Sequence, residues 1–266
     1  MGETTPFSLA GRTIVITGGG GILGQRMTQA LVDAGASVAV IDHDLAKASQ
    51  SAAVDGGMGR ALPFMVDITN TDAVLASLAD ISDAFGPVHG LVNNAAFKSE
   101  SFFEPFETFP LADWNAVMAV NLTGAMICSQ VFGAPMAERG LGAIVNTLSI
   151  YGIVAPDQRI YEGSEYEGRA INTPAVYSAS KAGLWGLTRY LSSYWAHRNV
   201  RVNALTPGGV YSGQNTTFVD RYSARVPMGR MAKSDEMSGA LVYLLSDASS
   251  YVTGQNITVD GGLTVW

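Results

Sequence analysis

Short apolar runs alternate with amphipathic stretches along the whole chain. Runs rich in β-branched and apolar residues occupy positions 13–16, 37–41, 61–66, 88–93, 143–148, 200–205 and 256–259. Apolar residues recur at helical spacing over stretches that include 22–34, 112–138, 177–197 and 233–245. Parallel strands read as apolar runs because helices cover both of their faces. The pattern therefore predicts βαβ units and one α/β domain over residues 1–266, with a doubly wound, mostly parallel sheet of seven strands.

Two segments interrupt this alternation. The stretch of about 153–174 is polar and aromatic without an apolar period, and the stretch of about 209–228 is similarly irregular. Irregular loops longer than about 12 to 15 residues in a compact domain are usually functional or disordered. We expect both segments to lie on the substrate side of the molecule, the first as an insert and the second as a loop.

Composition and charge exclude several classes of protein. The chain has 266 residues, of which 47% are hydrophobic and only 15% charged, and this is too apolar for a disordered chain. The net charge of −7 argues against nucleic acid or an anionic membrane as a partner. The single cysteine, Cys128, forms no intramolecular disulfide, and no Cys/His cluster has metal-ligand spacing, so we expect no metal and a cytoplasmic protein. The start lacks a signal-peptide pattern, and no uninterrupted apolar stretch reaches the ~18 residues of a membrane span.

A glycine cluster follows the first predicted strand. Gly18, Gly21 and Gly24 precede or open the helix at 22–34, where glycine permits positive φ and a close approach of the backbone to phosphate. A flexible turn would also contain glycines. However, Asp42 ends the second strand 18 residues after Gly24, near the spacing of about 20 expected for a carboxylate that binds the adenosine ribose. The pattern predicts a dinucleotide site, with a solvated strand end as the plain alternative for Asp42.

The charge of Asp42 also bears on the choice of dinucleotide. A carboxylate repels the 2′-phosphate of NADP, and no Lys or Arg lies between Gly18 and Gly24 or directly after Asp42, where His43 stands. The sequence therefore favours NAD.

A second group of residues points to acid/base chemistry. Tyr177 and Lys181 are spaced i, i+4 and so share one face of a predicted helix, and Ser149 ends a predicted strand. A phenol with a pKa near ~10 is a poor base unless a neighbouring ammonium favours the phenolate. Alone, this spacing arises often by chance.

Together, these residues resemble the short-chain dehydrogenase/reductase family over essentially the whole chain from Phe7 to Trp266. The matching segments occur in the order typical of that family. They are the Gly-rich turn after Thr17, Asp67-Ile68, Asn93-Asn94-Ala95-Ala96, Asn121, Ser149, Tyr177 with Lys181, Pro207-Gly208-Gly209-Val210, and 251–262.

The resemblance implies a Rossmann-type fold and a role for each catalytic group. Tyr177 would be the acid/base, and Lys181 would bind the nicotinamide ribose and lower the pKa of Tyr177. Ser149 would orient the substrate oxygen, and Asn121 would hold a water in a proton relay. The resemblance also implies a homotetramer or homodimer.

A larger set of residues would contact the cofactor. It comprises Gly18, Gly21, Ile22, Leu23, Gly24, Asp42, Asp67, Ile68, Asn93, Ala95, Tyr177, Lys181, Pro207, Gly208, Val210 and Ser212. Two of these positions and one neighbour depart from the usual pattern of the family, because Ile22 and the neighbouring Ala96 stand where Gly is common and Ser212 where Thr is common.

The step of 28 residues from Ser149 to Tyr177 is longer than in typical members of the family. The extra residues form the insert, whose charges and tyrosines suit a polyhydroxylated small molecule, because each desolvated hydroxyl needs a partner. Candidate substrate residues are Tyr151, Arg159, Tyr161 and Tyr166. An exposed decoration or an intersubunit contact explains the insert equally well. The insert also resembles a subgroup that modifies sugars for bacterial surface glycans such as nonulosonic acids.

The main hypothesis is an NAD-dependent oxidoreductase of secondary alcohols and ketones, acting on a sugar or sugar derivative. A non-catalytic NAD-binding regulator or scaffold of the same fold is the alternative from another class. A third reading keeps the enzyme but gives it a lipid-like or aromatic substrate, which an apolar lining of the insert would support.

Overall fold

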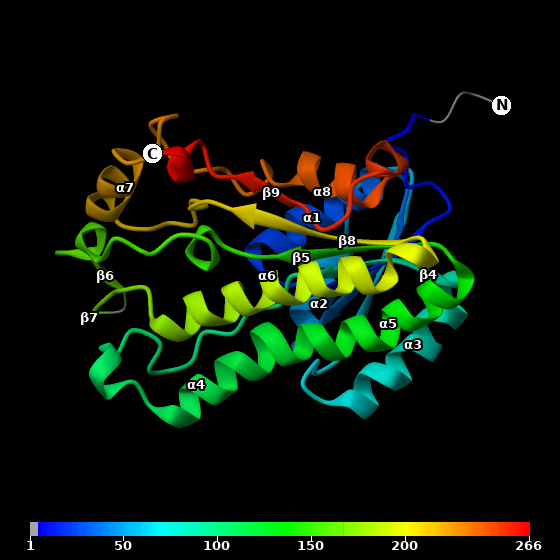
Figure 1. Cartoon of the computed structure of the whole chain (residues 1–266), viewed down its shortest axis with the longest axis horizontal. Coiled ribbons are helices and arrows are strands. Elements are labelled where there is room, and N and C mark those ends of the chain that lie inside the picture. Colours follow the sequence, from blue (N-terminus) through cyan, green and yellow to red (C-terminus); the bar gives the residue numbers. More distant parts are fainter. Residues whose placement is uncertain (1–4, 167) are drawn as a thin grey trace.

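Seven strands form one sheet in which every neighbouring pair is parallel (Figure 1). The computed structural model describes residues 5–166 and 168–266, without the side chain of Tyr166. The strands are β1 (Thr13–Thr17), β2 (Ser37–Asp42), β3 (Arg60–Met65), β4 (Val88–Asn93), β5 (Gly142–Thr147), β8 (Val200–Pro207) and β9 (Asn256–Val259). Their spatial order is β3-β2-β1-β4-β5-β8-β9. This confirms the α/β prediction, and the order reverses between β1 and β4, where doubly wound sheets open a ligand crevice.

Helices cover both faces of the sheet. They are α1 (Ile22–Asp33), α2 (Leu45–Ala52), α3 (Thr71–Phe85), α4 (Leu111–Met118), α5 (Ala125–Arg139), α6 (Ala175–Trp195), α7 (Thr216–Ser223) and α8 (Ser238–Leu245). Ile14 and Ile16 pack toward α1, α2 and α8, whereas Val15 packs toward α3, α5 and α6. The two hydrophobic layers explain why the central strands carry apolar side chains on both faces.

One long helix is apolar because it packs against the sheet. The helical segment Leu111–Arg139 has a mean hydropathy of 1.5 in its most apolar window and passes a length and composition test for a membrane span. However, 56% of that window is buried inside the molecule, where Cys128 and Phe132 belong to the core. These features are those of a core helix.

The structure corrects the predicted bounds at three places. The last helix begins at Ser238, later than the predicted 233, because Glu236 accepts hydrogen bonds from Arg230 and from the Lys233 amide and holds this segment in turns. The irregular loop predicted at 209–228 contains α7, capped by Asn215. The insert contains a 3-10 turn (Gln158–Tyr161) and a short antiparallel hairpin, β6 (Glu165–Tyr166) with β7 (Arg169–Ala170).

The insert and α7 lie beside each other at one end of the molecule, next to the C-terminus (Figure 1). They share a small hydrophobic cluster that includes Ile160, Phe218, Tyr222 and Leu263. Because this cluster is separate from the two layers of the sheet, the insert and α7 form a substructure with a core of its own.

Candidate active site

The glycine turn after β1 brings the backbone close to neighbouring segments. Gly18 has φ +61°, and a Cβ there would lie 2.7 Å from the Ala95 Cα. A Cβ on Gly24 would lie 2.4 Å from the Gly18 carbonyl oxygen. Helix α1 begins at Ile22 without a side-chain cap, so its first N–H groups face the groove as an anion site. This cradle fits a dinucleotide pyrophosphate.

A groove of about 860 Å³ lies over this turn. The predicted cofactor residues that line it are Gly18, Gly21, Ile22, Leu23, Gly24, Asp42, Asp67, Ile68 and Ala95. Other predicted cofactor residues lie elsewhere. Asn93 is buried and donates to Ser129 and Asn146, Gly208 and Val210 line a neighbouring pocket, Pro207 ends β8, and Ser212 is exposed.

Asp42 is held by the backbone around it. One carboxylate oxygen accepts from the Gly20 amide at 3.0 Å, and the other accepts from the Asp44 amide at 3.1 Å. The side chain is only 7% exposed although it lines the groove. A charged group is thus fixed in place at the predicted ribose position.

Sequence reasoning missed one basic residue in the groove. Lys47 on α2 lines it, and its Nζ lies 3.6 Å from the Asp44 carboxylate. Lys47 lies outside both the glycine turn and the position directly after Asp42, and the first turn of α2 brings it to the groove. The salt bridge to Asp44 offsets its charge.

The predicted catalytic residues come together beside the groove. Ser149 follows β5, while Tyr177 and Lys181 lie on α6 with the Lys181 Nζ 6.0 Å from the centre of the Tyr177 ring. The Lys181 ammonium donates to the Thr147 carbonyl at 2.8 Å. Burial lowers the pKa of Lys181 to about 8. Burial also raises the pKa of Tyr177, and a hydrogen bond with Ser149 acts in the opposite direction.

Asn121 lies in a π-helical turn (Ala119–Gly124) between α4 and α5. Its side-chain oxygen accepts from the Phe97 amide at 2.9 Å, and its amide donates to Ser180 on α6 at 3.1 Å. π-turns within α-helices are frequent at functional sites. Here the turn ties the loop after β4 to the helix that carries Tyr177.

A pocket of about 410 Å³ opens at Tyr177 and Ser149. Two of the candidate substrate residues, Tyr151 and Tyr161, line it, and their hydroxyls lie 3.4 Å apart. Arg159 does not line it, because its exposed guanidinium pairs with Asp157 at 2.8 Å. The side chain of Tyr166 lies outside the described part of the structure.

The pocket has more aromatic walls than the sequence suggested. The lining residues that the prediction missed include Phe97, Phe102 and Phe103 from the loop after β4, and Phe218 and Tyr222 from α7. The alternation of apolar runs gave no sign of these residues, because none of them belongs to a strand or a predicted helix.

A doubly wound parallel sheet, a glycine cradle with an acidic strand end and a Ser-Tyr-Lys-Asn cluster define a nicotinamide-dinucleotide oxidoreductase. The chain belongs to the short-chain dehydrogenase/reductase family and acts on CH–OH groups. A family model described as enoyl-(acyl carrier protein) reductase matches residues 21–264.

Known proteins resemble the chain along its full length. Galactitol 2-dehydrogenase (L-tagatose-forming) of Cereibacter sphaeroides is 36% identical over 275 residues, with 100% of both chains covered. The crystal structure of a gluconate 5-dehydrogenase from Burkholderia cenocepacia J2315 in complex with NADP and tartrate has a TM-score of 0.85 and 30% identity, covering 99% of both chains. A short chain dehydrogenase from Leptospira borgpetersenii with bound NAD+ has a TM-score of 0.84 and 31% identity, covering 97% of this chain and 95% of the other. The resemblance to enzymes of surface-glycan pathways stays a prediction.

Proposed function

We propose that this chain interconverts a secondary hydroxyl of a polyol and the corresponding ketone, with NAD as its cofactor. The observation that carries the proposal is the position of Tyr177. Its side chain lines a pocket beside the dinucleotide groove and shares that pocket with Ser149, above the buried ammonium of Lys181. The relative that acts on galactitol supports the choice of a polyol.

NAD is favoured over NADP because of Asp42. Its carboxylate is fixed by two backbone amides inside the groove, where it would meet the 2′-phosphate of NADP. Solved relatives bind NADP or NAD+, so the family admits both cofactors. Of the basic side chains that line the groove, Lys47 is directed to Asp44, and the His43 Nδ1 lies 3.0 Å from the Asp42 carboxylate.

Each residue of the site has a separate role in the oxidation of the alcohol. The nicotinamide, when bound, supplies a hydride acceptor. The phenolic oxygen of Tyr177 takes the proton from the substrate hydroxyl. Ser149 holds the substrate oxygen by a hydrogen bond. The predicted lowering of the pKa of Tyr177 is not seen in this structure, where burial raises that pKa. The Lys181 ammonium would act against burial by favouring the charged form of Tyr177, and it would hold the cofactor ribose. Asn121 keeps the loop after β4 in place and holds a water that continues the proton path.

The hydroxyl groups of the pocket suit a polyol. Tyr151, Tyr161 and Thr173 line it, and the Tyr161 and Thr173 hydroxyls lie 2.5 Å apart. A substrate hydroxyl that enters this chain of hydroxyls both donates and accepts, which offsets its loss of water.

The aromatic wall favours a second candidate within the same chemistry. Phe97, Phe102 and Phe103 give the pocket an apolar side, which suits a ring-bearing alcohol. A substrate panel that contains cyclic and aromatic secondary alcohols beside linear polyols separates the two candidates.

The decisive variant is Tyr177→Phe, which removes the acid/base group and keeps the ring. We expect kcat for the best polyol to fall about 1,000-fold, within the range for general acid–base catalysis, while the Kd for NAD changes less than twofold. Initial rates and calorimetry with NAD measure the two quantities. A kcat of the variant comparable to that of the wild type would show that Tyr177 is not the acid/base group. NAD binding without turnover of any alcohol by the wild type would favour the non-catalytic regulator.

Self-association of the chain, as a homodimer or homotetramer, is part of the same proposal. Tyr190 and Tyr194 on α6 stack at 5.7 Å and are 63% and 56% exposed, beside a hollow shared with α5. Exposed aromatic surface of this kind marks a protein contact.

A further inference from the structure

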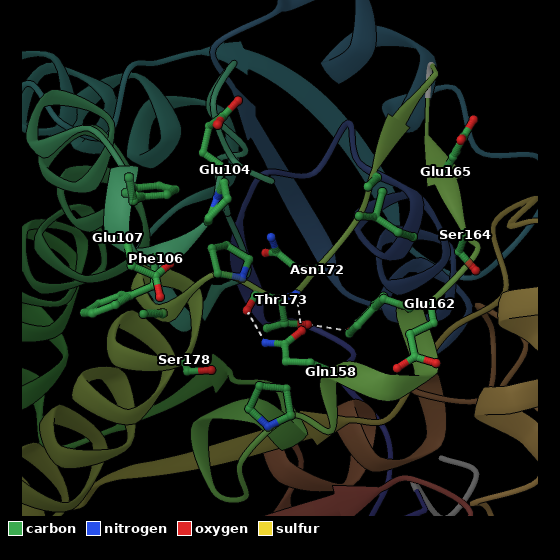
Figure 2. A pocket seen from close by; sticks show the side chains of 18 of the residues that line it. Glu104, Phe106, Glu107, Gln158, Glu162, Ser164, Glu165, Asn172, Thr173 and Ser178 are labelled. Carbon is green, nitrogen blue, oxygen red and sulfur yellow. Dashed lines mark hydrogen bonds between the residues drawn. The ribbon is translucent and has the colours of Figure 1, made fainter.

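A second cavity, larger than the catalytic pocket, adjoins it across the insert. It has a volume of about 990 Å³ and lies between residues 104–114, residues 156–165 and 170–174 of the insert, and the start of α6 (Figure 2). Tyr161, Asn172, Thr173 and Pro174 line both cavities. The second cavity, called here the outer chamber, is therefore the neighbour of the site where the reaction occurs.

We propose that the outer chamber binds a glycosyl extension of the substrate, so that the preferred substrates are glycosylated polyols rather than free ones. The inference rests on the proposed function, because it assumes that the reacting hydroxyl belongs to a polyol beside Tyr177. The extension then passes the shared residues and fills the outer chamber.

The volumes favour a substrate in two parts. Ligand pockets span roughly 300 to 1,000 Å³. The catalytic pocket, at about 410 Å³, lies near the lower end of this range and suits one small polyol. The outer chamber lies near the upper end and offers room for at least one further sugar ring. A free polyol would leave this larger space unused.

The lining of the outer chamber favours groups that donate hydrogen bonds. Figure 2 shows Glu104 and Glu107 on one wall and Glu162 and Glu165 on the opposite wall. Ionised carboxylates only accept hydrogen bonds. Among the described lining residues no Lys or Arg is present, so an anionic extension finds no counter-charge there.

Aromatic side chains supply the apolar part of the chamber. Phe106, Phe109 and Trp114 line it, and Phe106 is 73% exposed. An apolar wall with a few directed polar groups is the usual composition of a small-molecule site. A sugar ring has hydroxyls for the carboxylates and C–H faces for the aromatic rings.

Two side-chain oxygens at the chamber are without partners among the described residues. The Asn172 amide donates to the Phe103 carbonyl at 2.7 Å, but its buried oxygen accepts no hydrogen bond, and the buried Ser178 hydroxyl has no partner. Figure 2 shows Asn172 at the centre of the chamber, between the two walls of glutamates. Buried polar atoms are nearly always paired, so a rotation of either side chain toward a ligand hydroxyl would gain a hydrogen bond.

The chamber wall is anchored well enough to act as a binding surface. Gln158 and Thr173 exchange two hydrogen bonds across the insert, and Arg221 of α7 donates to the Arg159 and Glu162 carbonyls. These contacts join the insert to α7, which also lines the catalytic pocket through Phe218. The outer chamber and the catalytic pocket are therefore supported by the same substructure, formed by the insert and α7.

The test compares a free polyol with the same polyol carrying a sugar. With NAD and the wild-type enzyme, we expect lactitol or maltitol to have a kcat/KM at least tenfold above that of glucitol. A reduced chitosan disaccharide, which carries ammonium groups, distinguishes a charged extension from a neutral one. A preference for that disaccharide alone would show that the chamber selects an ammonium group rather than a glycosyl group, and would overturn the inference.

Variants locate the preference in the outer chamber. Phe106→Ala and the double variant Glu104→Gln/Glu107→Gln are each expected to reduce the advantage of the extended substrate at least threefold. Glu100→Gln is the matched control, since Glu100 is exposed on the same loop but does not line the chamber. An advantage that survives both chamber variants, or glucitol equal to every extended alditol, would overturn the inference while the proposed function stands.

Direct binding keeps the inference testable if no polyol is oxidised. Calorimetry with NAD-loaded Tyr177→Phe enzyme compares lactitol, maltitol and glucitol without turnover. Tenfold tighter binding of an extended alditol supports the outer chamber even where the proposed reaction fails, and equal or absent binding of all three rejects it.

Discussion

The dinucleotide groove and the substrate end of the molecule are built in different ways. The groove uses short segments that follow strands, such as the turn at Gly18–Gly24 and Asp42 at the end of β2, and its key contacts involve backbone atoms. The substrate end gathers side chains from the loop after β4, the insert, α7 and the C-terminus. The groove is set by local geometry, whereas the substrate end depends on which distant segments pack together.

This difference explains how specificity divides between the two regions. In the proposed function, backbone amides and the Asp42 carboxylate bind a cofactor that many enzymes share. In the same proposal, aromatic and hydroxyl side chains of the loops and of α7 fit the substrate, and such segments on a rigid scaffold change without disturbing the sheet. The comparison predicts large effects from one residue in the groove and small, shared effects at the substrate end.

The sharpest test of the groove is removal of the Asp42 charge. In Asp42→Asn the side-chain oxygen still accepts from the Gly20 amide, whereas the hydrogen bond from the Asp44 amide and the repulsion of a 2′-phosphate are lost. We expect the ratio of kcat/KM for NADP to that for NAD to rise about 10- to 100-fold, equivalent to about 1.4 to 2.8 kcal/mol. Initial rates with both cofactors measure this ratio.

Asp42→Ala is the companion variant, because it also removes the contact to the Gly20 amide. A further loss of kcat/KM for both cofactors would show what the hydrogen bond contributes to the turn. A wild-type enzyme that already prefers NADP would contradict the charge argument, and Lys47 would then be the residue to examine.

The second prediction, of intermediate expected size, concerns the effect of Lys181 on the free energy of unfolding rather than on cofactor specificity. Burial lowers its pKa from 10.5 to about 8. Below pH 8 the folded and unfolded states both bind the proton, and the folded state bears the cost of a buried ammonium. Between pH 8 and 10.5 the unfolded state binds more protons, so the free energy of unfolding rises with pH by about 3 kcal/mol from this group.

Lys181→Met removes that cost together with the hydrogen bond to Thr147, which contributes about 1 kcal/mol. We expect the variant to be inactive, yet about 1 to 2 kcal/mol more stable than the wild type at pH 7. Its stability should also lack the rise between pH 8 and 10.5. Urea unfolding across this range measures the effect, with the exposed Lys233→Met as control. A variant that keeps the alkaline rise would show that another group is its source.

The sequence predicted residues that act near their own strand and missed those brought in by packing. Ser149, Tyr177, Lys181 and Asp42 each follow a strand or share a helix turn, so their spacing, together with the family resemblance, was enough to propose them as site residues. Phe102 and Phe218 lie 116 positions apart and reach one pocket only through the packing of a loop and α7.

The insert also shows that sequence spacing does not predict which side chains line the pocket. Its length and polarity distinguish residues 153–174 from the regular alternation of strands and helices. Spacing, however, does not indicate which side chains of the insert face inward. Tyr161 lines the pocket and Arg159, two residues earlier, points to solvent and pairs with Asp157. A 3-10 turn of four residues makes this separation, and no periodic pattern of that length is long enough to detect.

Asp157 gives the smallest expected effect and tests whether the insert and α7 act together. Its carboxylate pairs with Arg159 and lies 3.2 Å from the Arg225 guanidinium, just beyond α7, and these contacts lower its pKa to about 2. The bridge is therefore fully formed at neutral pH and is lost only as the pH falls toward 2. Because the arginines are partly exposed, Asp157→Asn should raise KM for the substrate only about threefold and leave KM for NAD unchanged.

Steady-state kinetics at low salt and at 1 M salt measure this effect, with Asp83→Asn on α3 as the control. The difference in KM should vanish at high salt because exposed charges are screened. An equal change in KM for NAD would mean that the insert supports the whole site, and the division between groove and substrate end would fail.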